Sequence, residues 1–266
     1  MKDDPTTDAR SDVRDDARDE SATFAGMLQA QSVNRRLRKS ERTRYLILGK
    51  IAERIEQSPT GRITVETLLN DTGLSRGTFY NYFRDINDGI YVLLALFLET
   101  WNVDSQRQGG NKDLFKAIFD TNLLYCLRYE KNAAFFSAFS YYASSMSELL
   151  VLRNQINAAW AVRIAKAIER RFKISFSAQE NTYLQGTLRM LIVMTTGTLE
   201  EYYVHRNPLL CAAFSDVYEL SFALSRQWHP VLSNPAYSVA EMAHYQTLKG
   251  AMSVKADMSL LVGAEK

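Results

Sequence analysis

The sequence predicts an all-α fold. Apolar residues recur three and four positions apart along most of the chain, as they do on one face of a helix. Only 5 prolines and 12 glycines occur among the 266 residues, which is too few for the closely spaced turns of a β domain. The pattern predicts a small N-terminal unit of short helices followed by a larger domain of long ones.

Residues 1–34 are expected to form a disordered acidic tail. The first 23 residues hold eight acidic and four basic side chains and offer almost nothing apolar to bury. Residues 35–40 then form a basic arm that contains Arg35, Arg36, Arg38 and Lys39. Such an arm is either a solvated extension of the next helix or a segment that binds a polyanion.

An amphipathic helix is predicted from Tyr45 to Ile55, and a shorter second helix begins after Thr64. Thr64 has a side chain suited to capping a helix N-terminus, and Ile63 before it can pack on Leu68 as a hydrophobic staple. Gly73 can adopt the left-handed backbone conformation that ends a helix. The second helix therefore lies between Thr64 and a tight turn at Gly73.

A third helix is predicted from Arg76 to Tyr82, with Ser75 as its N-cap. It is too short to be stable alone, so Phe79 and Phe83, four residues apart, must hold it by packing. Its other side offers a guanidinium, an amide and hydroxyls, which bind the phosphates and base edges of duplex DNA. The candidate DNA-binding residues of this region are Arg35, Arg36, Arg38, Lys39, Thr64, Ser75, Arg76, Gly77, Thr78, Tyr80, Asn81 and Tyr82.

With these elements, residues 41–101 resemble the DNA-binding domain of the tetracycline-repressor (TetR) family of transcriptional regulators. The resemblance rests on the apolar first helix, the sequence GRIT before the second helix, the run TGLSRGTFYNYF that ends at Phe83, and a fourth helix from about Asn87. It implies that the motif 64–83 places helix 76–82 in the major groove. It also implies a fourth helix that joins this unit to a helical effector-binding domain.

One departure from the family pattern affects an expected DNA contact. The family commonly has a lysine at the position of Ile86, where it meets a phosphate at the start of the fourth helix. Isoleucine cannot make that contact. Arg84, two residues earlier, is the candidate substitute and completes the expected DNA-binding set.

The rest of the chain predicts further helices. They cover residues 112–129, 133–150, 152–172, 178–205 and 211–228, after a polar linker that ends in two glycines. Ser177 and Glu180 form a capping box for helix 178–205. Residues 111–230 are expected to be a helical effector-binding and dimerisation domain. Residues 231–266 are expected to be a C-terminal extension with one short helix near residues 239–251.

Helix 178–205 is apolar on nearly every side, so both of its faces must be covered. One face is expected to pack on the protein's own core, and the other on a second copy of the chain, with Gly186 and Gly197 permitting a close approach. The two-fold homodimer would then present two copies of helix 76–82 to a palindromic operator. The expected interface residues are Leu184, Leu188, Leu191, Thr195, Phe214, Tyr218 and Phe222.

Aromatic and sulfur-containing side chains are concentrated in the middle helices. The family resemblance implies a cavity there for a small, largely apolar effector, and phenol groups among apolar walls suit a ligand with one or two polar atoms. A stripe of Phe and Met is also the usual content of a core. The candidate ligand-binding residues are Tyr125, Phe136, Phe139, Tyr142, Met146, Trp160, Tyr183, Met190 and Met194.

Several other functions are not favoured by the sequence. The 2 cysteines and 3 histidines lack metal-ligand spacing, so no metal and no cofactor is expected. A phosphate-binding glycine loop is missing, as is a nucleophile with a plausible base, so an enzyme is not expected. Without a signal peptide or an apolar run of membrane length, we expect a cytoplasmic protein.

The predicted function is a dimeric repressor released from DNA by a small effector. The alternative is a TetR-like DNA-binding protein regulated by a protein partner.

Overall fold

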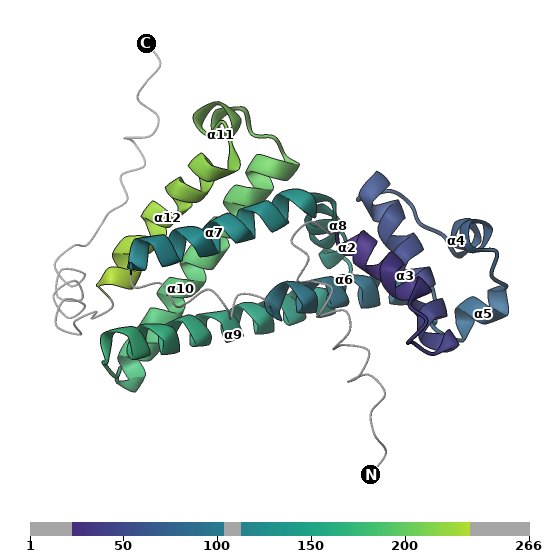
Figure 1. Cartoon of the computed structure of the whole chain (residues 1–266), viewed down its shortest axis with the longest axis horizontal. Helices are drawn as coiled ribbons and strands as arrows, with labels where there is room; N and C mark the ends of the chain where they lie inside the picture. Colours follow the sequence, from purple (N-terminus) through teal and green to yellow (C-terminus); the bar gives the residue numbers. More distant parts are fainter. Residues whose placement is uncertain (1–22, 104–112, 235–266) are drawn as a thin grey trace, which may run out of the picture.

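The computed structural model describes residues 23–103 and 113–234, and all regular structure in these two ranges is helical (Figure 1). They contain eleven α-helices and one π-helical segment. The expectation of an all-α protein is therefore confirmed. The molecule is elongated: the short helices of residues 65–80 lie at one end, while the helices of residues 178–233 lie toward the other (Figure 1).

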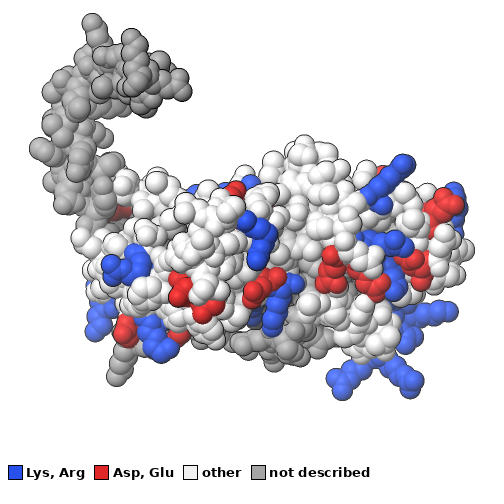
Figure 2. Space-filling model, turned by 90° about the horizontal axis from the view of Figure 1, so that it is seen from above, with Lys and Arg blue, Asp and Glu red and all other residues white. Residues whose placement is uncertain are grey.

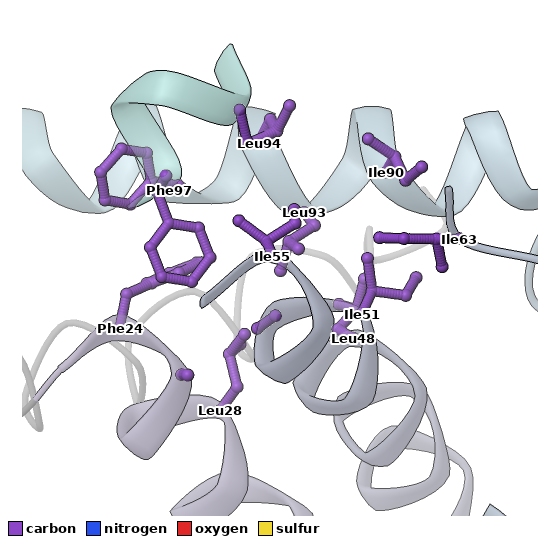
Figure 3. Close-up of a cluster of buried hydrophobic side chains, with 14 of the residues drawn as sticks. Phe24, Leu28, Leu48, Ile51, Ile55, Ile63, Ile90, Leu93, Leu94 and Phe97 are labelled. Atoms are coloured by element: carbon purple, nitrogen blue, oxygen red, sulfur yellow. The ribbon is translucent and has the colours of Figure 1, made fainter. Parts of the chain in front are cut away.

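The end with the short helices contains α3 (Lys39–Gln57), α4 (Val65–Thr72), α5 (Arg76–Tyr80) and the first part of α6 (Ile86–Val103). It shares one apolar core with residues 24–28 and 135–149 of neighbouring helices. One face of α3 buries Leu48, Ile51 and Ile55 completely, and Leu93 of α6 is equally buried (Figure 3). Gly89 lets α6 approach α3 closely, because a Cβ atom there would lie 2.9 Å from Cδ1 of Ile51.

Helix α2 (Phe24–Val33) corrects the expectation that residues 1–34 are a disordered tail. The side chain of Phe24 packs edge-on against Phe97 of α6, with 5.2 Å between ring centroids, and against Phe135 at 5.3 Å. Its backbone N–H donates to Oδ1 of Asn132, and Leu28 is fully buried. Burial of these apolar side chains stabilises the helix. Residues 1–22 lie outside the described residues.

The other end contains two further apolar clusters and the remaining helical elements, most of which are longer. These elements are α7 (Leu114–Lys131), α8 (Ala133–Ala143), α9 (Ser147–Phe172), α10 (Ala178–Leu199), the π segment η2 (Glu200–Val204), α11 (Pro208–Ala213) and α12 (Val217–Ser233). A buried hydrogen bond of 2.8 Å from Nε1 of Trp228 to Oγ1 of Thr195 joins α12 to α10. The capping box of Ser177 and Glu180 at the start of α10 is present, as predicted.

The predicted helix 133–150 is interrupted between Ala143 and Ser147. The hydroxyl groups of Ser144 and Ser145 donate to the carbonyl oxygens of Tyr141 and Tyr142, at 2.7 and 3.1 Å. Bonds of this kind compete with helical backbone pairing and favour a break. The chain therefore turns between α8 and α9.

The C-terminal end of α12 lies beyond the predicted boundary. The helix continues through Pro230 to Ser233, and Leu232 is buried in the core. Packing of that side chain outweighs the one backbone donor that proline removes. The polar linker and the short helix expected near residues 239–251 lie outside the described residues.

Candidate nucleic-acid interface

Both predicted helix caps are present in the pair α4 and α5. Oγ1 of Thr64 accepts a hydrogen bond of 3.2 Å from the backbone N–H of Thr67. Oγ of Ser75 accepts one of 3.1 Å from the N–H of Thr78. Between the helices, Gly73 has the expected positive φ of 67°. Local side-chain chemistry thus fixes where α4 begins and ends and where α5 begins.

Two phenylalanines anchor α5, as predicted from their spacing. Phe79 and Phe83 are only 1% and 2% exposed and belong to the same buried cluster as α3 and α6. The regular helix ends at Tyr80, earlier than predicted. A backbone hydrogen bond of 3.1 Å from the N–H of Phe83 to the carbonyl of Phe79 still carries one more turn.

The outward side of α5 is polar and open to solvent. Arg76, Gly77, Tyr80 and Asn81 are exposed, and Tyr80 keeps 53% of its surface. The side chains of Arg76, Tyr80 and Asn81 make no hydrogen bond within the described part of the chain. Their donors and acceptors are therefore available to a partner molecule.

Besides Thr64, whose hydroxyl caps α4, three predicted DNA-binding side chains of the α5 region have structural contacts of their own. The hydroxyls of Ser75 and Thr78 are hydrogen-bonded to each other at 2.9 Å, next to the N-cap bond of α5. Tyr82 is half-buried against the apolar cluster. These residues can contribute only the part of their polar surface that the fold leaves open.

The basic residues 35–39 are exposed, but they do not form a free arm. Lys39 is the first residue of α3, and the arginines occupy the connection from α2 to α3. There the N–H of Arg36 donates to Oδ1 of Asn34 and that of Leu37 to the carbonyl of Asn34. Because α2 is packed against the rest of the protein, it fixes the start of the segment that was expected to be an arm. Lysine and arginine side chains project from the end of the molecule that carries α3, α4 and α5 (Figure 2). The side chains of Arg35, Arg36, Arg38 and Lys39 are all exposed.

Arg84, the expected substitute for a phosphate-binding lysine, holds the start of α6. Its guanidinium pairs with Asp88 at 3.2 Å, and its backbone N–H donates to the same carboxylate at 2.9 Å. The backbone hydrogen bond, with the guanidinium, lowers the pKa of Asp88 below its ordinary value. The Arg84 side chain is 87% exposed, so a phosphate can reach it. That phosphate would compete with the carboxylate of Asp88 for the same guanidinium.

The interface residues expected on α10 are mostly inside the protein. Leu184, Leu188 and Thr195 are at most 4% exposed and pack in the chain's own core, so placing them in a dimer interface was wrong. Leu191 is half-buried there. Of the three expected residues near α12, Tyr218 and Phe222 are 58% and 51% exposed, whereas Phe214 is half-buried.

The exposed apolar face of α10 is a different one from that expected. Met190 and Val193 are 72% and 54% exposed. Gly186 and Gly197 are on the same face by spacing, and a Cβ atom at either would have no neighbour within 4 Å. This face is an apolar strip with room for a second backbone to approach.

The nine predicted ligand-binding residues do not line one common cavity in the described structure. Seven of them are divided among three packed clusters, and Phe136 stacks on Tyr129 with ring centroids 3.9 Å apart. Met190 is on the surface. Tyr142 lines a cleft next to α4, which is described below. The distribution by residue is as follows: Phe139, Tyr142 and Met146 with the first cluster; Trp160 with the second; Tyr125 with the third; Phe136 and Met194 each with two; Tyr183 half-buried.

The described residues contain no group of three His, Cys, Asp or Glu side chains placed to hold a metal ion. Both cysteines are free, and burial raises the pKa of the Cys126 thiol to about 11. None of the described helices has the length and apolar character needed to cross a bilayer.

A comparison of the chain with protein-family models gives no match, and a comparison with curated proteins gives none.

Proposed function

We propose that the protein is a sequence-specific DNA-binding transcriptional regulator: a dimeric repressor that a small, largely apolar effector releases from a palindromic operator. The observation that carries the proposal is α5, which is held from inside by two buried phenylalanines while Arg76, Tyr80 and Asn81 stay exposed and unpaired within the described residues. A guanidinium recognises guanine or phosphate, and an amide recognises adenine.

The surroundings of α5 support the same function. Exposed arginines of the α2–α3 connection add positive charge at this end of the molecule, and each phosphate that they neutralise would strengthen binding at low salt. The likeness of residues 41–101 to TetR-family DNA-binding domains points in the same direction.

The uncovered faces of α10 and α12 support the proposed homodimer. Both helices expose large apolar side chains, and the two glycines of α10 leave room for a close approach. To bind two half-sites of a palindrome in successive major grooves, the dimer would need its two copies of α5 about 34–36 Å apart, which is one turn of duplex DNA.

The experiment that tests this function is selection of genomic fragments by the purified full-length protein. We expect enrichment of a short palindrome with two half-sites, and protection of both half-sites in footprinting. Recovery of fragments without any shared sequence would contradict sequence-specific binding.

Tyr80→Ala and Asn81→Ala should weaken DNA binding in different ways. Because a phenol at the backbone contacts phosphate, Tyr80→Ala should lower affinity by a similar factor on operator and on random duplex. Asn81→Ala should cost about 1–3 kcal/mol on the operator and relax the preference at particular base pairs. Fluorescence anisotropy on both duplexes distinguishes the two. Equal losses on both duplexes for both variants would refute this division.

Gly77→Ala and Gly73→Ala form a matched pair of tests. Gly77 is in α5, and a Cβ atom there would meet only Oγ of Ser75, at an ordinary contact distance of 3.9 Å. Alanine should therefore stabilise the fold by about 0.5–1 kcal/mol, yet weaken binding to all DNA if a phosphate approaches that backbone. Gly73 has a left-handed φ, so alanine there should destabilise the fold by about 1 kcal/mol. Denaturation curves and anisotropy measure both effects. Unchanged DNA affinity of Gly77→Ala would exclude the close approach.

A second candidate is a DNA-binding protein that responds to a protein partner. The packing of the nine predicted ligand residues favours it, because no shared cavity among them is found in the described structure. A small-molecule site elsewhere in the molecule would favour an effector instead.

A further inference from the structure

A cleft of about 500 Å³ lies where the end with the short helices meets α8. One wall is formed by the residues that lead into α4 and by the first turn of α6, and the other by Tyr141 and Tyr142 at the C-terminal end of α8. The volume is within the range of small-molecule sites. The predicted ligand-binding set touches this cleft only through Tyr142.

Aliphatic, aromatic and polar residues share the walls of the cleft. Val65 and Ile86, both half-buried, supply most of the aliphatic surface, whereas Ile90 of α6 is only 1% exposed. The ring of Tyr141 stands edge-on to that of Tyr142, with 5.0 Å between centroids, and 51% of Tyr141 is exposed. Such walls accommodate a flat or branched apolar body about the size of one ring.

The charge of the cleft comes from Arg62. It is the one charged side chain among the residues that line the cleft, and no carboxylate faces it there. Arg62 is exposed and takes part in none of the ion pairs of the described residues. An unpaired guanidinium beside an apolar wall is suited to a carboxylate, which it can bind through two parallel hydrogen bonds.

We propose that this cleft binds a small organic carboxylate with an aromatic body, with Arg62 holding the carboxylate and Tyr141 contacting the ring. The consequence for regulation rests on the proposed DNA-binding function. A ligand that touches both the entrance to α4 and the end of α8 fixes the spacing between the α4–α5 pair and the long helices. DNA binding also depends on this spacing. A ligand that favours one spacing over another therefore changes the affinity of the protein for its operator.

Calorimetric titration of the full-length protein with benzoate tests the site without any DNA. We expect saturable binding with a Kd on the order of 1 mM or tighter. Arg62→Gln should weaken it at least about tenfold, and so should replacing benzoate by the neutral benzamide, because each removes the charge-assisted hydrogen bonds. Arg170→Gln, which removes an exposed arginine at the far end of α9, is the matched control and should leave binding unchanged.

A second variant tests the cavity itself. Ile86→Trp adds a ring to a half-buried position on the cleft wall, and it should abolish benzoate binding while circular dichroism shows an intact helical fold. No saturable binding of benzoate by the unmodified protein, or equal binding by Arg62→Gln, would overturn the proposal.

Operator affinity with and without benzoate distinguishes the site from its regulatory role. We expect benzoate to change the operator affinity of the unmodified protein and not that of Arg62→Gln. If the protein bound benzoate through Arg62 but selected no DNA sequence, the result would support the benzoate site and contradict the proposed function. If Arg62→Gln instead weakened binding to random duplex and left benzoate binding unchanged, Arg62 would be a phosphate contact and the cleft proposal would be wrong.

Discussion

Phe79→Ala is expected to remove the proposed DNA-binding activity by unfolding the α5 region. Phe79 is 1% exposed, so alanine leaves a cavity in the cluster that joins α5 to α3 and α6. Truncation of a buried phenylalanine reduces the free energy of unfolding by about 3–5 kcal/mol. A helix of five residues has no stability of its own to offset that loss. Urea denaturation followed by circular dichroism measures the change, and operator anisotropy measures its effect.

The neighbouring Tyr80→Ala is the matched control for Phe79→Ala. Tyr80 has a similar ring but is 53% exposed, so its removal should change the free energy of unfolding by at most about 1 kcal/mol. The two variants separate the anchor of α5 from its outward surface. If Phe79→Ala kept both its stability and its operator affinity, the position of α5 would not depend on packing of Phe79.

The features of the α4–α5 pair that the sequence does predict are local. A threonine and a serine at helix starts and a glycine in the turn act on backbone groups within a few residues, so their effect does not depend on the rest of the fold. The caps at Thr64 and Ser75 and the conformation of Gly73 were therefore predictable. The end of α5 was less so, since no residue near Tyr80 forces the helix to stop.

Helix α2 shows where a sequence signal was present and outweighed by composition. Phe24, Met27, Leu28 and Gln31 follow the spacing of one helical face and are all buried. The charged residues before them obscured this pattern, because a short amphipathic segment beside a polar run resembles the end of a disordered tail. The buried face required partners from α6 and α8, which are far away in sequence.

The faces of α10 could not be assigned from sequence for a different reason. Both Leu188 and Met190 are apolar, and hydrophobicity alone does not say which of two apolar faces packs on the same chain. The structure buries Leu188 completely and leaves Met190 72% exposed. Likewise, phenyl rings that fill a core and rings that line a cavity have the same composition, so the aromatic middle helices gave no reliable position for a ligand.

Val193→Asp is expected to convert the protein into a monomer with at least about a hundredfold lower operator affinity. Val193 is 54% exposed on the apolar strip of α10, so the isolated chain tolerates a charge there. In the proposed dimer the carboxylate would be buried without a partner, which costs several kcal/mol. Loss of the second half-site then removes the gain of about 10²–10⁴ that simultaneous binding of two linked sites provides. Analytical ultracentrifugation and operator anisotropy measure the two losses.

Val151→Asp is the matched control for Val193→Asp. It shows whether an effect comes from the α10 surface or from adding a charge at any exposed valine. Val151 is 55% exposed on α9, so the same change is made at the same exposure on a different helix. It should leave sedimentation and operator affinity as they are. Leu188→Asp would not serve, because a charge at a fully buried position unfolds the chain's own core and lowers affinity for that reason alone. A dimer that persists in Val193→Asp would place the interface elsewhere, and a monomer that retains full operator affinity would separate DNA binding from two-fold symmetry.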